Sequence, residues 1–330
     1  MPSKSDDFKQ AAQLNNPFMP LVSIITPSYN QGNFIQRTIE SVLNQSYSNI
    51  EYWVIDGGSK DNTVSILKDY ENDPRFHWLS EPDQGQGDAV NKGWQLCKGD
   101  ILGWLNSDDT YLEDAVKTQV EALINLQEVG LVYGDALFID ENDKTIGNYH
   151  TRPFNRKRFL HVSSIPQPTA FFYRSLLKKV GLLNTNLHYA LDYEFFLRLM
   201  WHTTFLYTGK QVATYRLHPS SKTVDGYKQM LEETIAVVKQ VCDQYPVVLA
   251  ETKMKAISDW YWMGAINSLE SRNYADVRQY ARNAMVSYSI RPRIGIFLFK
   301  FFDTVFHTKV FETAISLIDE IAYSLSKLKS

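Results

Sequence analysis

The sequence predicts an α/β fold, with a mostly parallel sheet flanked by helices, followed by a C-terminal α-helical subdomain. Between residues 21 and 106, short apolar runs alternate with segments of helical periodicity, a pattern typical of parallel strands joined by crossover helices. From about 131 the pattern changes to a hairpin, and past about 222 the strand signals stop. We therefore expect a lead-in at 1–20, an α/β domain at 21–222 and a helical subdomain at 223–330.

Four short apolar runs are predicted to be strands buried on both faces, at 21–27, 50–56, 76–81 and 101–106. Helices are expected between them, at 34–45, 59–70 and 87–97. In the first helix Ile35, Ile39, Val42 and Leu43 fall on one stripe, and Ser59 and Asp61 are candidate caps of the second.

The second half of the sequence predicts a less regular set of elements. We expect a hairpin over 131–147, a strand at 166–174, a helix at 189–202 and a strand at 211–218 that ends in a histidine. Helical patterns then cover 227–245, 255–271, 274–288 and the stretch after 308.

The composition excludes several classes of protein. At 330 residues the chain has room for about two domains, and a net charge of −3 shows no footprint for nucleic-acid binding. The two cysteines, Cys97 and Cys242, are far apart and fit no metal-ligand spacing, which indicates buried thiols in a reducing compartment. The N-terminus lacks the apolar core of a signal peptide, and no apolar run is long enough to span a bilayer. These features predict a cytoplasmic protein.

Polar segments follow each of the first four strands, namely "SYNQGN", "DGGSKDN", "PDQGQGD" and "NSDD". The carboxyl ends of parallel strands share one edge of the sheet, where open α/β folds bind ligands. The sequence thus predicts one crevice that contains Asn30, Asp56, Asp83, Asp88, Asn106, Asp108 and Asp109.

The adjacent carboxylates Asp108 and Asp109 suggest a bound cation. Such a pair repels and raises its pKa values unless a cation lies beside it, and hard cations such as Mg²⁺ or Mn²⁺ take carboxylate oxygens plus substrate phosphates. The alternative is a solvated turn that caps a helix near 112.

After Asp56, two glycines leave the backbone uncovered, so that a planar ring can lie there and donate a ring N–H to the carboxylate. Here the alternative is an ordinary βα turn.

The phosphate-binding motifs of other nucleotide enzymes are absent from the sequence. "GQGDAV" begins like a dinucleotide fingerprint but has Val90 where the third small residue belongs, and there is no P-loop. A diphosphate in the crevice would therefore most simply be neutralised by a metal.

Five segments together resemble the family 2 glycosyltransferases with the GT-A fold, in the bacterial branch that has "WLNSDD" at the fourth strand. They are "VSIITPSYNQGNFIQRTIESVLNQSY", "IDGGSKDNT", "DQGQGDAVNKG", "LGWLNSDDTY" and "LDYEFFLRL", and the resemblance covers about residues 21–222. It implies an inverting transferase that uses a nucleotide-diphosphate sugar, most often a UDP-sugar, and a divalent metal, Mn²⁺ or Mg²⁺. The implied acceptor is a saccharide or lipid-linked saccharide in surface polysaccharide biosynthesis of the cell envelope.

The resemblance also implies roles for the residues of the nucleotide and metal sites. Asp56 matches the carboxylate that contacts the base, and "NSD" lies at the metal-binding DxD motif. Asn106 replaces its first aspartate, so the amide is left to bond a ribose hydroxyl and Asp108 is the principal protein ligand, oriented by Asp109. The remaining nucleotide contacts implied are Pro27, Tyr29, Asn30 and Asp83.

Asp192 matches the catalytic base, which takes the proton of the acceptor hydroxyl; Leu191 replaces the more usual glutamate, and Glu194 is expected to support the base. His218 resembles the histidine that completes the metal or diphosphate site, and imidazole suits Mn²⁺ better than Mg²⁺. Arg216 and Lys222 are expected to neutralise phosphate. Gln167, a polar residue in an apolar strand, is expected to contact the acceptor or the donor sugar.

Two other classes of function stay open, a catalytically silent nucleotide- or sugar-binding scaffold and a sugar nucleotidyltransferase. The apolar stretch 291–306, flanked by basic residues, is either a packed helix or a peripheral membrane contact. The basic stretch 152–159 is either a solvated loop or a contact for an anionic carrier lipid. The sequence predicts no oligomeric state.

Overall fold

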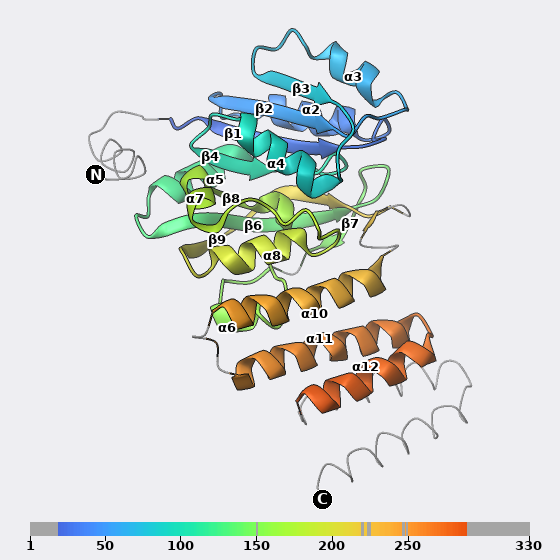
Figure 1. Ribbon diagram of the computed structural model, residues 1–330. Coiled ribbons are helices and arrows are strands. Elements are labelled where there is room, and N and C mark those ends of the chain that lie inside the picture. The colour runs from blue at the N-terminus through green and yellow to red at the C-terminus, as the bar shows by residue number, and fades with distance from the viewer. Residues whose placement is uncertain are drawn as a thin grey trace, which may run out of the picture. The chain divides into compact units, whose positions relative to one another are not determined.

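The computed structural model describes residues 19–149, 151–218, 221–222, 226–245, 248 and 250–288. Contacts between residues divide the chain into two compact units (Figure 1). One unit contains the chain up to Phe159 together with Ser163–Tyr227, and the other contains Leu160–Val162 together with the chain from Lys228 onward. The sequence had suggested a division near 222, and no pattern in it indicated that three residues near 160 belong with the helices.

The described residues of the first unit form a nine-stranded mixed sheet in the order β3-β2-β1-β4-β8-β6-β9-β5, with β7 paired to β6. The predicted α/β fold with a mostly parallel sheet is confirmed for β1 to β4, whose pairings β1–β2, β1–β4 and β2–β3 are all parallel. These strands are β1 (Val22–Ser28), β2 (Ile50–Asp56), β3 (Phe76–Ser80) and β4 (Ile101–Trp104).

The register brings the carboxyl ends of the first three strands level with one another. Ser28 pairs with Asp56, and Asp56 pairs with Ser80, so the last residue of each strand lies in one row. The polar segments that follow these strands consequently begin at the same edge of the sheet, as the sequence predicts.

The second half of the sheet is antiparallel in part. The predicted hairpin is confirmed as β6 (Val129–Ile139) and β7 (Thr145–Asn148), and β9 (Thr204–Arg216) runs parallel to β6 and begins seven residues earlier than predicted. The strand predicted at 166–174 is wrong in its first half. A 3₁₀ turn, η1 (Gln167–Thr169), replaces it because Pro166 and Pro168 cannot donate to a sheet, and β8 covers only Phe171–Tyr173.

The sequence did not predict β5 (Thr110–Tyr111), a two-residue strand that pairs antiparallel with β9. It follows directly after "NSDD" and joins that loop to the far edge of the sheet.

Helices lie against the sheet. They are α2 (Ile35–Leu43), α3 (Thr63–Asp69), α4 (Gln86–Leu96), α5 (Ala115–Ile124) and α8 (Leu191–Leu199), with shorter turns α6 (Arg156–Phe159), η2 (Arg174–Leu176) and α7 (Leu177–Val180). The predicted helices are confirmed as α2, α3, α4 and α8, whereas no range was predicted for the others. The expected cap of α3 is wrong in detail. Asn62 is at the cap position, whereas the side chain of Asp61 binds Thr63 and that of Ser59 binds Asp56.

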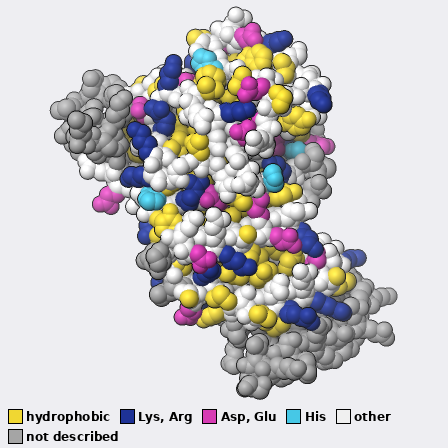
Figure 2. Space-filling model, in the orientation of Figure 1, with side chains coloured by type: hydrophobic (Ala, Val, Ile, Leu, Met, Phe, Trp, Pro, Cys, Tyr) yellow, Lys and Arg dark blue, Asp and Glu magenta, His cyan; other side chains and the backbone are white. Residues whose placement is uncertain are grey.

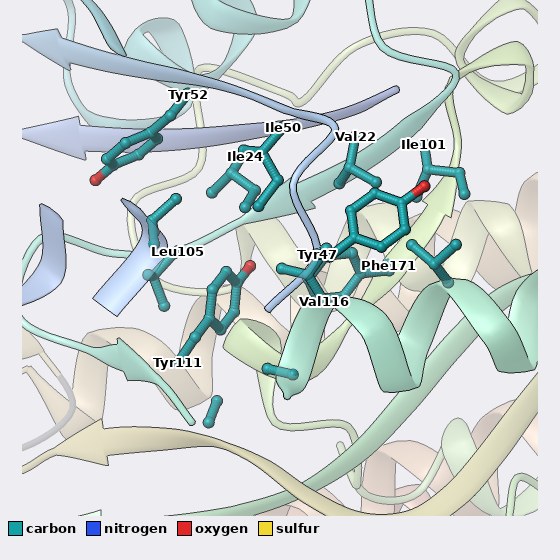
Figure 3. Packing of buried hydrophobic residues seen from close by; sticks show 14 of the residues in the cluster. Val22, Ile24, Tyr47, Ile50, Tyr52, Ile101, Leu105, Tyr111, Val116 and Phe171 are labelled. Atoms are coloured by element: carbon teal, nitrogen blue, oxygen red, sulfur yellow. The ribbon is translucent and has the colours of Figure 1, made fainter. Parts of the chain in front are cut away.

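The core of the first unit lies between the sheet and these helices. Figure 3 shows apolar side chains of β1, β2 and β4 packed with Tyr111 of β5, Val116 of α5 and Phe171 of β8. Ile24 and Val116 are completely buried. Burying such a side chain contributes roughly 1.5–3 kcal/mol. Tyr111 is buried in the same core, so it ties the short strand β5 to the rest of the sheet in addition to the pairing with β9.

Most described residues of the second unit lie in three helices, α10 (Tyr227–Gln244), α11 (Ala250–Glu270) and α12 (Tyr274–Ser287). The segment Leu160–Val162 belongs to this unit through two contacts with α11. Nδ1 of His161 lies 2.7 Å from Oδ2 of Asp259, and Trp260 Nε1 donates to the Leu160 carbonyl.

None of the helices in the described part of the chain has the length and apolar character needed to cross a bilayer. The stretch 291–306 and the lead-in up to residue 18 lie outside the described residues. Figure 2 shows acidic and basic side chains interspersed over the face in view.

Candidate active site

A cavity of about 610 Å³ lies where the carboxyl ends of β1 to β4 meet the start of α8 and the segment after β9. This volume is within the range of small-molecule sites. Most of the predicted site residues line it. They are Pro27, Tyr29, Asp83, Asn106, Asp108, Asp109, Gln167, Asp192, Arg216 and His218.

The pair Asp108 and His218 is the candidate metal site. Nε2 of His218 lies 3.1 Å from Oδ2 of Asp108. The side chain of His218 is 6% exposed and that of Asp108 is 22% exposed. The described residues contain no cluster of three or more Asp, Glu, His or Cys side chains suited to a metal. Two protein ligands are nevertheless enough for a divalent cation that completes its shell with substrate phosphates and water.

Asp109, the residue after Asp108, is buried and is hydrogen-bonded to the end of β9. Its Oδ1 accepts a hydrogen bond of 2.8 Å from the backbone N–H of Arg216, and Asn106 Nδ2 lies 3.4 Å from its Oδ2. Burial, and secondly the charge of Asp108, raise the pKa of Asp109 well above its usual value. Asp109 therefore joins the "NSDD" loop to the end of β9.

Arg216 is fully engaged by protein acceptors, a different role from the phosphate contact expected for it. Its side chain has no exposed area; Nε donates to the Asp108 carbonyl, Nη1 to the Asp140 carbonyl and Nη2 to Asp143. Burial alone would raise the pKa of Asp143, but hydrogen bonds from Arg216 and Arg37 outweigh it and lower that pKa. The guanidinium thus holds the β6–β7 turn against the metal-site loop.

Asn106 lines the cavity, but its side-chain oxygen already has two donors. Oδ1 accepts hydrogen bonds from Gln86 Nε2 at 2.8 Å and Trp104 Nε1 at 3.0 Å. Gln86 in turn accepts from Lys222 Nζ at 2.9 Å. These contacts link the "NSDD" loop through α4 to the segment after β9, and they place the Lys222 ammonium at the cavity wall.

Asp56 is at the predicted strand end, but the described cavity wall does not include it. The residue has no exposed area, and its carboxylate accepts hydrogen bonds from Gly58 N, from N and Oγ of Ser59, and from Ser80 Oγ. The arrangement orders the loop after β2. Gly58 has a φ of +81°, which favours glycine. The base contact of Asp56 stays a prediction.

Gly57 and Asp83 line the cavity at this loop, side by side. A Cβ on Gly57 would lie 2.8 Å from Oδ2 of Asp83, so a larger residue at this position would displace that carboxylate. Burial raises the pKa of Asp83. Asn30, which was expected beside the nucleotide, instead accepts a hydrogen bond from Lys60 N and lies outside the described wall.

Asp192 lies in the first turn of α8 and lines the cavity, as expected for a base. Burial, and secondly the charge of Asp192, raise the pKa of Tyr149. Glu194 was expected to support the base, but its carboxylate has a different partner. It forms a buried two-point ion pair with Arg198, at 2.7 and 2.8 Å, and Arg198 Nη2 also donates to the Leu182 carbonyl. Glu194 therefore fixes α8 in place and does not line the described cavity.

Several residues of the wall were not predicted from the sequence. Gln86, His188, Tyr189, Tyr215 and Ser221 all line the cavity. No sequence motif marks these residues, and only the tertiary fold brings them to the cavity.

The family model described as glycosyl transferase family 2 matches residues 23–181. An uncharacterized glycosyltransferase of Mycobacterium tuberculosis is 39% identical over 186 residues, which cover 54% of this chain and 68% of that relative. The chondroitin synthase of Escherichia coli is 30% identical over 223 residues, which cover 67% of this chain but only 32% of the synthase.

Two solved structures share the fold. The S. aureus TarS fragment 1–349 in complex with UDP-GlcNAc has a TM-score of 0.62 at 15% identity, with 86% of this chain and 89% of that chain covered. The mannosyltransferase PcManGT from Pyrobaculum calidifontis, in complex with GDP-Man and Mn²⁺, has a TM-score of 0.55 at 18% identity, with 97% and 92% covered.

The sheet order, the cavity at its carboxyl edge and these likenesses define a glycosyltransferase with the GT-A fold. The chain belongs to glycosyltransferase family 2.

Proposed function

We propose that the chain is a metal-dependent, inverting glycosyltransferase that moves a sugar from a UDP-sugar to a saccharide or lipid-linked saccharide acceptor. The observation that supports this best is the placement of Asp108 and His218, 3.1 Å apart, in the same cavity as the carboxylate of Asp192. One cavity thus holds a candidate metal pair and a candidate base, which is what the reaction needs.

Asp108 and His218 are the residues that would hold a divalent cation. The donor set fits, because carboxylate oxygen suits both Mg²⁺ and Mn²⁺ and imidazole favours Mn²⁺. When bound, the cation neutralises charge on the diphosphate. The Mn²⁺ named with the Pyrobaculum mannosyltransferase supports this assignment.

The chain's own residues supply orientation and a base. Pro27 and Tyr29 line the part of the cavity after β1, where we place the nucleotide. Lys222 brings an ammonium group to the wall, where it can attract phosphate oxygens.

Asp192 takes the proton of the acceptor hydroxyl. That oxygen forms a bond to the anomeric carbon while the bond from the carbon to the diphosphate oxygen breaks and the nucleoside diphosphate leaves. Attack from the face opposite the diphosphate inverts the anomeric configuration.

The choice of uridine and of a saccharide acceptor rests on relatives. UDP-GlcNAc is the ligand named with TarS, and chondroitin synthase is named for the polysaccharide that it makes. We accordingly place the protein in surface polysaccharide synthesis on the cytoplasmic side of the envelope. The proposed membrane contact of 291–306 lies outside the described residues.

Release of nucleotide tests the proposal. The purified protein is incubated with UDP-Glc, UDP-Gal, UDP-GlcNAc, UDP-GalNAc or GDP-Man, with Mn²⁺ or with EDTA, and released UDP or GDP is measured. We expect release from one UDP-sugar in Mn²⁺, none in EDTA, and strong losses in Asp108→Ala and Asp192→Asn. Glu121→Gln, an exposed carboxylate on α5, is the control. Nucleotide binding without turnover by any donor would support the silent scaffold, for which the replacement of a carboxylate by Asn106 is the supporting observation.

A further inference from the structure

The cavity wall contains buried polar atoms that have no partner in the protein. Among the described residues they are Ser28 Oγ, Gln31 Oε1, Gln167 Oε1 and Ser221 Oγ. Buried polar side-chain atoms are nearly always hydrogen-bonded in native proteins. Four residues that line one cavity thus each carry a polar atom without a protein partner, and Gln167 has the most definite geometry.

Gln167 has a fixed orientation. Gln167 is 6% exposed, and its Nε2 donates a hydrogen bond of 2.6 Å to the carbonyl oxygen of Trp104, the last residue of β4. Exchanging the two ends of the amide would put oxygen against oxygen, so the hydrogen bond assigns Oε1 as the end without a partner.

The turn that carries Gln167 is rigid. Pro166 and Pro168 flank the residue, Thr169 Oγ1 donates to the Pro166 carbonyl at 2.8 Å, and Gln119 Nε2 of α5 donates to the Thr169 carbonyl at 2.6 Å. A buried acceptor on such a turn is preorganised for a ligand and adapts little to a poor one.

We propose that Gln167 Oε1 accepts a hydrogen bond from a hydroxyl or N–H of the transferred sugar and thereby selects the donor. This inference rests on the proposed function. An amide oxygen only accepts hydrogen bonds, so its partner must be a donor, and an ionised diphosphate has no hydrogen to give.

The transferred sugar fits this position better than the acceptor does. Nε2 of Gln167 is bonded to Trp104 at the end of β4, and Asn106 and Asp108 follow in the same segment, so Gln167 is anchored to the strand end that presents Asp108. The transferred sugar is joined directly to the diphosphate and therefore lies next to the cation that Asp108 would hold. A saccharide acceptor has no such link to the diphosphate.

The consequence is selectivity for one polar group on the donor. A site built to bond a substrate hydroxyl discriminates strongly against the analogue that lacks it, because the buried partner is left without a hydrogen bond. Losing that group should reduce kcat/KM by about tenfold or more.

The test compares substrate analogues with two glutamine variants. Donor hydrolysis in Mn²⁺ is measured for the preferred UDP-sugar and for its 2-, 3-, 4- and 6-deoxy analogues, and donor affinity is measured by calorimetry. The variants are Gln167→Met and the control Gln45→Met. Gln45 is also a buried glutamine whose Nε2 donates to backbone carbonyls, those of Ser41 and Leu112, but it lies outside the described cavity wall and makes no hydrogen bond to the turn that carries Gln167.

In the wild-type protein and in Gln45→Met, we expect kcat/KM for one deoxy analogue to be about tenfold or more below that for the parent donor. In Gln167→Met, kcat/KM for that analogue and for the parent donor should be nearly equal. Equal discrimination in Gln167→Met and wild type would overturn the inference while the proposed function stands. An effect of Gln167→Met that appears only with deoxygenated acceptors would also overturn it. If no nucleotide sugar binds to the wild-type protein, the proposed function fails and the inference fails with it.

Discussion

Nε2 of His218 lies 3.1 Å from Oδ2 of Asp108, although the two residues are 110 positions apart in the sequence. The short strand β5 explains the approach. Thr110 pairs with Thr214 in antiparallel register, so the residues before β5 run alongside those after β9. Arg216 strengthens the junction through its bonds to the Asp108 carbonyl and the Asp109 carboxylate.

Removing either member of this pair should weaken metal binding. We expect Asp108→Ala and His218→Ala each to reduce the affinity for Mn²⁺, measured by calorimetry in the presence of UDP, by at least about tenfold, since even loss of a residue that only supports a metal ligand commonly costs that much. Glu121→Gln should bind Mn²⁺ like the wild type. Unchanged Mn²⁺ affinity in both cavity variants would place the metal elsewhere.

Asp192→Asn should separate catalysis from binding. The amide cannot take a proton from the acceptor, so we expect kcat to fall by about 10²–10⁴. The dissociation constant for UDP should stay within about twofold, because the base contacts the acceptor and not the nucleotide. A variant that keeps its turnover would show that another group is the base.

Arg216→Met should act mainly on stability. It removes a buried guanidinium and leaves the Asp108 and Asp140 carbonyls without donors, so we expect the free energy of unfolding to fall by about 3 kcal/mol. Urea denaturation measures this directly. Wild-type stability together with loss of UDP binding would instead support the phosphate contact expected from the sequence.

Asp56→Asn distinguishes loop order from recognition of the base. One acceptor oxygen becomes an NH₂ group that faces N–H and O–H donors, so the free energy of unfolding should fall by about 1–3 kcal/mol. If Asp56 only orders the loop, the affinities for UDP and for CDP should fall to a similar degree. The control is Ser80→Ala, which removes one hydrogen-bond donor to the same carboxylate and should show the same pattern. A selective change in the UDP-to-CDP ratio, absent from Ser80→Ala, would establish the predicted base contact.

The first half of the fold was predictable because β1, β2 and β4 are buried along almost their whole length and read as continuous apolar runs. The common edge followed from that, since parallel register brings Ser28, Asp56 and Ser80 level. The prediction of burial on both faces is wrong for β3, an edge strand in which only Phe76 is buried.

The later elements were harder. β5 has only two residues, too few for any period. In β9 the exposed residues Gly209, Lys210 and Gln211 interrupt the apolar pattern in the middle of the strand, which hid its first half.

The chemistry of individual side chains was predictable only in part. The sequence indicates a carboxylate at the end of β2, but it does not show which groups donate hydrogen bonds to that carboxylate. A ring N–H was expected, whereas in the structure backbone N–H groups of the next loop donate to Asp56. The sequence likewise marks Arg216 as a cation near the site, while two of the acceptors that engage its guanidinium, Asp140 and Asp143, come from the β6–β7 turn, about 75 residues away in the sequence. Long-range pairing decides such cases.

The most direct measurement is thermal stabilisation of the wild-type protein and of Asp108→Ala by UDP, GDP, TDP and CDP, each with and without Mn²⁺. A ligand at about 100 times its dissociation constant adds roughly 2.7 kcal/mol of stability. We predict that UDP stabilises the wild-type protein only with Mn²⁺ and that Asp108→Ala loses this effect. Stabilisation by none of the four nucleotides, or an equal metal-dependent effect in Asp108→Ala, would contradict a nucleotide-sugar site built on Asp108 and His218.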